Sequence, residues 1–478
     1  MLKASPRFQS SSGRAFLGAA ALLLPALFLA ARHPDGGTGD GPPPPARNLI
    51  LMIPDGFGPA SLGLARGCSE EPLALDGIVV GTCGTEPAAG RVTDSAAGAT
   101  AYACGVKTRN GAIGVDAGGQ SVPTLLERAE ERGLATGLVT TTSITHATPA
   151  AFSAHVPSRV FAAAIASQQL EQGIEVLFGG GAGDYLPREA GGGRTDGRDL
   201  LAEARGSGYA VARTREEFDA LGEAPALGLF ADGHMSYEID RDPARQPSLL
   251  EMTEKALALL RDDPDGFFLM VEGGRIDHAA HANDPAGHLR DILAFDAAVG
   301  AALEFARSHG NTLVVVVADH ETGGLTLGRS VDGTPYYTWR PDVVLGVRTT
   351  VGRMAGLARE PGTAAAVLAE WAGIDELDRV EARRLEELEA LPAAERLEAL
   401  PDFFLDTINR HAVLGWSTGG HTAVDVQLFA FGPGSGELVG HWENDALGRR
   451  LAAWLSPGDS GDAGDAGDAG DSGDGPPR

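Results

Sequence analysis

The sequence of 478 residues has little positive charge. It contains 38 lysines and arginines against 65 aspartates and glutamates, and its formal net charge is −27. This deficit argues against nucleic acid as a partner, because nucleic-acid binding needs a basic face. It also gives no reason to expect attraction to an anionic membrane. An acidic protein that acts on an anion must make its site locally positive, with metal ions or with arginine.

Cysteine is also scarce. Only Cys68, Cys83 and Cys104 are present, and their spacing does not match a zinc-cysteine site. In an exported protein, three cysteines allow one disulfide and leave one thiol. We expect Cys68 and Cys83 to pair, because Cys104 lies in a run of small residues that predicts a buried helix.

The first residues have the order of a secretory signal peptide. Lys3, Arg7 and Arg14 precede an apolar run at residues 15–31, as in a segment that directs export. The run is also near the lower length limit of a membrane span, so an uncleaved N-terminal anchor is the alternative. We expect residues 1–31 to be a signal peptide or anchor, and the protein to be exported to the periplasm or the extracellular space.

Two further segments lack the apolar residues that a core needs. Residues 32–46 include four consecutive prolines and predict a Pro/Gly linker. Residues 457–478 repeat Gly-Asp and predict a disordered acidic tail, with calcium binding by its aspartates as the alternative. Residues 47–456 remain as the folded domain.

Within this domain, apolar β-branched segments alternate with helical patterns. Strands are expected at residues 48–53, 135–141, 175–178, 267–271, 313–318 and 426–431. Helical spacing of apolar residues is found at 122–132, 248–261 and 286–308. This alternation predicts an α/β fold, a three-layer sandwich with a large, mostly parallel central sheet flanked by helices. Residues from about 360 to 412 interrupt the rhythm and predict a small helical insertion.

Polar residues follow several of these strands. Asp319 and His320 come directly after the strand at 313–318, at the edge where open α/β sheets carry their sites. A metal site and a buried hydrogen-bonded pair are both consistent with this pair. Asp55 follows the first strand beside glycines, and on its own it could equally be a turn residue or a helix cap.

The segment 272–281 is the densest in ionisable residues. Glu272 and two glycines precede Asp277, His278 and His281. Asp277 and His281 are four residues apart, so on a helix they share one face, as metal ligands must. His421 follows two glycines just before the strand at 426–431. A lone histidine is usually structural, but this one repeats the pattern of glycines followed by a ligand.

Ser95 opens a run of small residues and is expected near a helix N-terminus, where backbone N–H groups favour an anion. A serine there can simply cap the helix, or it can be a nucleophile activated by a base or a metal. His146 and Thr148 follow the strand at 135–141, and Arg159 comes later. An arginine fork matches a phosphate group, although a single arginine is more often a surface residue.

Together these segments offer oxygen and nitrogen ligands without thiolates, a set that suits zinc with magnesium. The candidate ligands are Asp55, Glu272, Asp277, His281, Asp319, His320 and His421. A pair of adjacent metals stabilises both the attacking and the leaving oxygen of an in-line displacement, for which a phosphoryl group is the natural electrophile.

In this order, the segments resemble the alkaline phosphatase family from about residue 48 to 455. The shared motifs are Asp55-Gly56, Asp94-Ser95-Ala96, His146-Ala147-Thr148-Pro149-Ala150, Glu272-Gly273-Gly274-Arg275-Ile276-Asp277, Asp319-His320-Glu321-Thr322-Gly323-Gly324 and Gly419-Gly420-His421-Thr422. The resemblance implies that residues 47–456 form a catalytic domain with two zinc ions and one further ion, usually magnesium. It assigns the first zinc to Asp277, His281 and His421, the second to Asp55, Asp319 and His320, and the third ion to Asp55, Thr148 and Glu272.

The resemblance also implies a mechanism of two displacements. Ser95 is the nucleophile that becomes a phosphoserine, Arg159 clamps two phosphate oxygens, and water then releases phosphate. His146 stands where some bacterial members carry aspartate, and His278, which would bind substrate, stands where they carry lysine. A histidine beside the third ion could admit zinc there in place of magnesium.

The expected function is therefore a metal-dependent phosphomonoesterase of broad specificity, and the family implies a homodimer. Sibling enzymes of the superfamily, such as a phosphodiesterase or a sulfatase, are one alternative. They commonly use threonine or a modified cysteine as nucleophile, so Ser95 with Arg159 favours a monoesterase. A silent phosphate- or zinc-binding module is the alternative from a different class.

Overall fold

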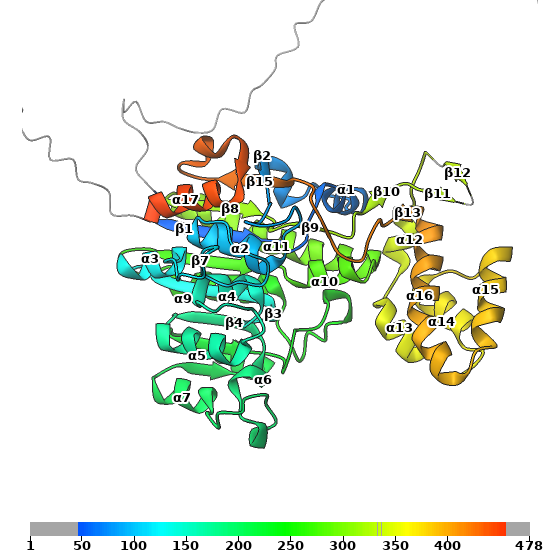
Figure 1. Ribbon diagram of the computed structural model, residues 1–478, viewed down its shortest axis with the longest axis horizontal. Helices are drawn as coiled ribbons and strands as arrows, with labels where there is room; N and C mark the ends of the chain where they lie inside the picture. The colour runs from blue at the N-terminus through cyan, green and yellow to red at the C-terminus, as the bar shows by residue number, and fades with distance from the viewer. Residues whose placement is uncertain (1–45, 332, 336, 456–478) are drawn as a thin grey trace, which may run out of the picture. The chain divides into compact units, whose positions relative to one another are not determined.

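The structure is a computed structural model that describes residues 46–331, 333–335 and 337–455. A ten-stranded sheet forms its centre (Figure 1). In sheet order the strands are β16 (Gly440–Glu443), β2 (Val79–Gly84), β15 (Val426–Phe431), β8 (Thr312–Val317), β1 (Asn48–Ile53), β7 (Phe267–Glu272), β3 (Ala135–Ser143), β4 (Val176–Gly180), β6 (Ala226–Leu229) and β5 (Ala210–Ala212). Within this sheet only β15 runs against the others.

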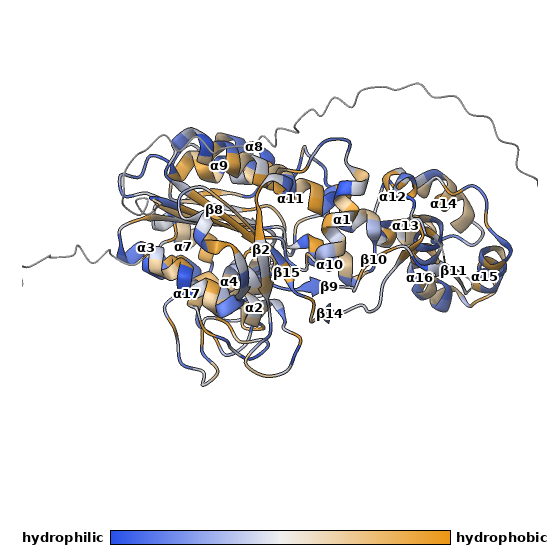
Figure 2. Ribbon diagram, turned by 90° about the horizontal axis from the view of Figure 1, so that it is seen from above, coloured by the Kyte–Doolittle hydropathy of each residue, from blue (hydrophilic) through white to orange (hydrophobic). Residues whose placement is uncertain are grey.

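Helices cover both faces of the sheet, so the expected three-layer α/β fold is confirmed. Figure 2 shows α8 (Arg215–Ala220), α9 (Leu249–Leu260) and α11 (Pro285–His309) over one face. The other face carries α2 (Ser95–Cys104), α3 (Leu125–Glu131), α4 (Ala147–Ser153) and α17 (Asn444–Leu455). The strands between these layers are buried on both sides, and every residue of β1, β7 and β8 is buried. This explains why their sequences are continuous apolar runs.

A helical region interrupts the alternation after the sheet strand β8. It contains α12 (Pro341–Gly346), α13 (Val351–Leu357), α14 (Ala364–Ala372), α15 (Arg379–Glu389) and α16 (Ala393–Ala412), drawn in yellow and orange in Figure 1. The helical region begins at Pro341, ahead of the segment expected at 360–412. Asp240 holds the connection between α12 and α13, because its carboxylate accepts hydrogen bonds from the hydroxyls of Thr349 and Thr350.

Two short antiparallel strands lie near the carboxyl edge of the sheet and matter for the site. β9 (Glu321–Thr322) follows β8 after a turn, and it pairs with β14 (His421–Thr422). In this pairing His421 is the partner of Thr322. Segments that are far apart in the sequence are therefore held side by side.

The expected disulfide between Cys68 and Cys83 is wrong, because all three cysteines are free and buried. Cys68 ends α1 (Pro59–Cys68), whereas Cys83 lies in β2 with its Sγ 3.5 Å from the hydroxyl of Tyr102. Burial raises the pKa of the Cys83 thiol to about 12 and that of Cys68 to about 11. The thiols are thus protonated core residues and poor nucleophiles.

The signal or anchor segment at 1–31, the acidic tail at 457–478 and nearly all of the linker at 32–46 lie outside the described residues. Within the part of the chain that the structure describes, no helix is long and apolar enough to cross a bilayer.

Candidate active site

Three neighbouring parallel strands bring their polar ends together. β1 lies between β8 and β7 in the sheet, so Asp55 after β1, Asp319 after β8 and Glu272 at the end of β7 meet at one edge. All three carboxylates are fully buried. Four buried carboxylates, including Asp277 on α10 (Arg275–His281), are therefore concentrated at the carboxyl edge of the sheet. Buried charges of one sign need compensating cations.

Asp277, His281 and His421 form one group of converging ligand atoms. His281 Nε2 lies 3.2 Å from Asp277 Oδ2 and 3.0 Å from His421 Nε2. Donors around a tetrahedral zinc, with bonds of about 2.0–2.1 Å, are separated by about 3.3 Å, so these spacings fit such an ion.

The outer nitrogen of each histidine in this group has a carbonyl partner. His281 Nδ1 donates to the carbonyl of Gly419, and His421 Nδ1 donates to that of Thr93, both at 2.7 Å. These bonds leave the Nε2 lone pairs directed at the common centre, as in metal-ligating histidines.

Asp55, Asp319 and His320 surround a second centre next to Ser95. His320 Nε2 lies 3.5 Å from Asp55 Oδ1, 3.3 Å from Asp319 Oδ2 and 3.2 Å from Ser95 Oγ. Asp319 Oδ2 and both carboxylate oxygens of Asp55 are buried, and they have no hydrogen-bond partner among the described residues. A second group of converging ligand atoms joins Asp55, Asp277 and His320.

The protonation behaviour of this second centre also favours a cation. Burial and then the neighbouring carboxylates of Asp319 and Asp277 raise the pKa of Asp55 well above its ordinary value. Burial and then Asp277 likewise raise the pKa of Asp319. Burial lowers the pKa of His320, so its imidazole is neutral. A neutral nitrogen among carboxylates is the donor set of a zinc site, and the residues fit the ion that the resemblance implies.

A third group of ligand atoms joins Asp55, Glu272 and His146. Thr140 and Thr142 donate to Glu272 Oε2. Glu272 Oε1 and the buried hydroxyl of Thr148 have no partner within the described part of the chain. Two carboxylates and a hydroxyl are oxygen ligands of the kind that magnesium prefers, and the imidazole of His146 is what would let zinc compete.

Ser95 is the first residue of α2 and is only 2% exposed. The preceding residue, Asp94, caps the helix, because its carboxylate accepts from the backbone N–H of Ala97 at 3.0 Å. The capping role considered for Ser95 therefore belongs to Asp94. This leaves the Ser95 hydroxyl free to face His320, beside a helix N-terminus that favours an anion.

Arg159 is held near Ser95 by a hydrogen bond to Asp94, the residue that precedes Ser95. Its Nη1 donates to Asp94 Oδ2 at 3.2 Å, and its Nη2 donates to His146 Nε2 at 2.7 Å. Its backbone N–H donates to the carbonyl of Gly111 at 2.7 Å. The guanidinium is therefore a partly exposed, oriented fork and not a free surface cation, and such a fork suits two oxygens of a phosphoryl group.

His278 is accompanied by a histidine that the sequence did not reveal. The ring of His234 lies 4.6 Å from that of His278 and 5.3 Å from that of His146, both edge-on. Its Nδ1 accepts from the backbone N–H of Ser143 at 3.0 Å, so its Nε2 carries the proton when the ring is neutral. Burial and then Arg275 lower the pKa of His234 to about 4 and that of His278 to about 3. No motif marked His234, because only the fold brings its loop to this edge.

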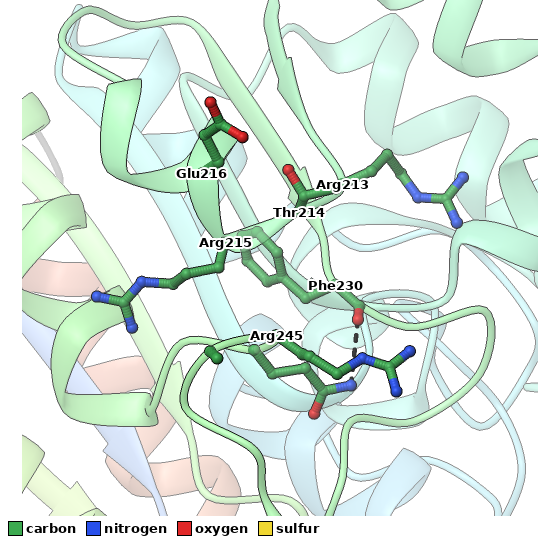
Figure 3. Close-up of a pocket in the computed structure, with 8 residues that line it drawn as sticks. Arg213, Thr214, Arg215, Glu216, Phe230 and Arg245 are labelled. Carbon is green, nitrogen blue, oxygen red and sulfur yellow. Dashed lines mark hydrogen bonds between the residues drawn. The ribbon is translucent and has the colours of Figure 1, made fainter.

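A pocket of about 430 Å³ lies elsewhere in the chain and is shown in Figure 3. Its lining includes Arg213, Arg215 and Phe230, and it contains none of the candidate site residues. Arg213 is paired with Asp232, and Arg215 is paired with Asp219 and Glu251. Arg245 also lines the pocket, but because the pocket includes neither Ser95 nor any of the groups of converging ligand atoms, it is not a candidate for the phosphate site.

Comparisons with known proteins agree with the motifs. The model of the alkaline phosphatase family matches residues 46–456. The chain is 38% identical over 460 residues to the repressible alkaline phosphatase of Saccharomyces cerevisiae, covering 86% of this chain and 81% of that protein. A cold-active alkaline phosphatase from Shewanella sp. has a similar structure, with a TM-score of 0.78 and 32% identity over 86% of this chain and 100% of that one.

A further structural relative is a histidine-to-aspartate mutant of the alkaline phosphatase from the Antarctic bacterium TAB5, with magnesium bound in its M3 site. It is 29% identical to this chain over 86% of this chain and 99% of that one, with a TM-score of 0.64. The family match spans all of the described residues, and relatives above 30% identity are covered over most of their length. This chain therefore belongs to the alkaline phosphatase family.

Proposed function

We propose that this alkaline phosphatase hydrolyses a broad range of phosphate monoesters at alkaline pH, with Ser95 as its nucleophile. The observation that carries the proposal is the position of the Ser95 hydroxyl. It lies at the N-terminus of α2, 3.2 Å from His320 Nε2 and next to buried carboxylate oxygens that have no hydrogen-bond partner among the described residues. A serine hydroxyl is a weak nucleophile unless a cation or base lies beside it.

Two zinc ions and one magnesium ion suit the three groups of donor atoms. We assign the first zinc to Asp277, His281 and His421, the second to Asp55, Asp319 and His320, and the third ion to Asp55, Thr148 and Glu272, with His146 beside it. When bound, these ions supply the positive charge that favours the Ser95 alkoxide and balances the charge of the phosphoryl oxygens.

The chain's own residues then act in two displacements. Ser95 Oγ forms a bond to phosphorus and gives its proton to solvent, and the bond from phosphorus to the leaving oxygen breaks as that oxygen takes up a proton and departs as the alcohol. Water next attacks the phosphoserine, the bond between phosphorus and Oγ breaks, Oγ takes up a proton, and phosphate leaves. Arg159 binds two phosphoryl oxygens while its Nη1 keeps the hydrogen bond to Asp94. For this, Nη2 must give up its hydrogen bond to His146 Nε2 and donate to the substrate instead.

His278 and Arg159 favour a monoester over a diester or a sulfate ester. A monoester dianion offers three free oxygens to the helix N-terminus, the arginine fork and the His278 ring. His278 accepts from Arg275 through Nδ1 at 2.6 Å, so its Nε2 is a donor when the ring is neutral. The buried, converging ligand set also argues against a silent binding module.

Trapping of the covalent intermediate tests the proposal directly. The full-length protein, loaded with zinc and magnesium, is mixed with a phosphate monoester, quenched in acid, digested and examined by mass spectrometry. We expect a phosphoryl group on the peptide that contains Ser95. A catalytically active protein that never carries phosphate on Ser95 would overturn the proposal.

We also infer that the protein is exported and that it forms a homodimer. Export is supported by the basic and apolar pattern of residues 1–31, and the dimer by membership of the family. Cell fractionation, with sequencing of the mature N-terminus, tests export and separates a cleaved signal from an anchor. Light scattering of the purified protein tests the dimer, and a monomer mass would contradict it.

A further inference from the structure

Thr322 lies between the two proposed zinc sites. It belongs to β9, has no exposed surface and occupies the space between Asp277 and His320. Its Oγ1 lies 2.6 Å from Asp277 Oδ1 and 3.2 Å from His320 Nδ1. Under the proposed assignment Asp277 holds the first zinc and His320 the second, so one hydroxyl contacts a ligand of each.

The direction of the two hydrogen bonds follows from their chemistry. A metal-binding carboxylate is an acceptor only, so the Thr322 hydroxyl must donate its single proton to Asp277. Oγ1 can then only accept from His320, which places the proton of the imidazole on Nδ1. The lone pair of His320 is therefore on Nε2, the nitrogen that faces Asp55, Asp319 and Ser95.

The surrounding backbone holds Thr322 firmly in this position. Its N–H donates to the carbonyl of Gly56 at 3.1 Å, and its strand pairs with that of His421. A Cβ on Gly56 would lie 2.8 Å from both Thr322 Oγ1 and Asp277 Oδ1, so the packing leaves no room for another group. The neighbouring Glu321 accepts from the N–H of Gly324 and from the hydroxyl of Thr422, which braces the same pair of strands.

We propose that Thr322 is a positioning residue that links the two zinc sites through its hydroxyl. The proposal rests on the assignment of Asp277 and His320 as zinc ligands under the proposed function. Thr322 orients Asp277 for the first ion and fixes the tautomer of His320 for the second. Loss of the Thr322 hydroxyl affects both sites together. Its proton serves Asp277 in the first site, and its oxygen lone pair serves His320 in the second.

A valine at position 322 tests the role of the hydroxyl with little change of shape. Thr322→Val leaves Asp277 Oδ1 and His320 Nδ1 without their shared partner while it fills the same space. Loss of such an outer hydrogen bond lowers metal affinity by about 10–100-fold in other metalloproteins. We expect both zinc ions to be lost at a chelator concentration at least about tenfold lower than for the wild type.

The measurement is the zinc content of the full-length protein after dialysis against a graded zinc chelator. Thr322→Ser keeps the hydroxyl and should retain zinc nearly as well as the wild type. Thr253→Val is the matched control, because Thr253 is equally buried but donates to the carbonyl of Leu249 within α9, away from the ligands. Thr322→Ala, which removes the hydroxyl by truncation, provides a second test if the valine variant does not fold.

Early loss of both zinc ions from Thr322→Val or Thr322→Ala, with retention in Thr322→Ser and Thr253→Val, supports the link. Retention equal to the wild type in a folded hydroxyl-free variant overturns it, and so does the loss of one zinc alone. The readout is independent of catalysis. A wild type that binds two zinc ions but lacks phosphatase activity would contradict the proposed function and leave the test of Thr322 valid. A wild type that binds no zinc would overturn both.

Discussion

Arg159→Ala is expected to weaken transition-state binding while leaving Ser95 in place. The Arg159 side chain is partly exposed and donates to Asp94 and His146. Asp94 does not depend on it, because its carboxylate also accepts from the backbone N–H groups of Ala97 and Gly111. The N-terminal turn of α2, which carries Ser95, should therefore survive the substitution.

The size of the effect follows from the hydrogen bonds that Arg159 would make to the phosphoryl group. Each hydrogen bond to a charged group contributes about 1.5–3 kcal/mol. Two such bonds correspond to about 3–6 kcal/mol, or a decrease of about 10²- to 10⁴-fold in kcat/KM. Arg159→Lys keeps the charge without the planar fork, so it should recover only part of the loss.

The assay is steady-state hydrolysis of p-nitrophenyl phosphate, with inhibition by inorganic phosphate and zinc content measured on the same samples. We expect Arg159→Ala to keep its zinc while both kcat/KM and the affinity for phosphate fall. A decrease in kcat/KM of less than about threefold, at full zinc content, would refute the phosphate clamp. A decrease that tracks zinc loss would instead make Arg159 a residue that maintains the metal site.

Three further predictions concern the third ion, the contact between His234 and His278, and the buried carboxyl group of Asp291. With His146 beside the third site, activation of zinc-loaded protein should be slow or incomplete until magnesium is added; full activity in magnesium-free, zinc-only buffer would contradict this. His234→Ala removes an edge-on ring contact with His278 worth about 0.5–1.5 kcal/mol, so the KM for a monoester should rise about two- to tenfold; an unchanged KM would argue against it. Burial raises the pKa of Asp291 to about 8. Between about pH 4 and 8 the folded state therefore keeps a proton that the unfolded state releases. The free energy of unfolding falls as the pH rises through this window. Asp291→Asn keeps the carbonyl that accepts from the N–H of Glu238 and should flatten this slope in urea unfolding; an unaltered slope would exclude Asp291 as its source.

The sequence predicts the centre of the sheet well and its margins poorly. β1 and β8 are buried on both faces, so their apolar runs are easy to recognise. The pattern missed β2, β5, β6 and β16, which are short, glycine-containing or partly exposed. Gly81 in β2 illustrates the reason, since a Cβ there would lie 1.8 Å from the carbonyl oxygen of Gly440 in β16. The glycine that obscures the strand in the sequence is what lets its neighbour approach.

The candidate site shows a similar division. Asp55, Glu272 and Asp319 could be grouped in advance because each ends a strand, and parallel strands end at one edge. His234 and Thr322 could not, because their contacts with His278, Asp277 and His320 exist only after distant segments meet. The erroneous Cys68–Cys83 pairing has the same origin, since spacing along the chain does not show that Cys83 faces Tyr102.

The most direct test of the central claim compares p-nitrophenyl phosphate with its bis ester, from about pH 7 to 10, in zinc and magnesium. The wild type is measured beside Ser95→Ala. We predict fast turnover of the monoester, and its collapse both in the variant and after chelation of the metals. Preference for the diester, or activity that does not depend on Ser95, would contradict the account and assign the site to a different hydrolase of the superfamily.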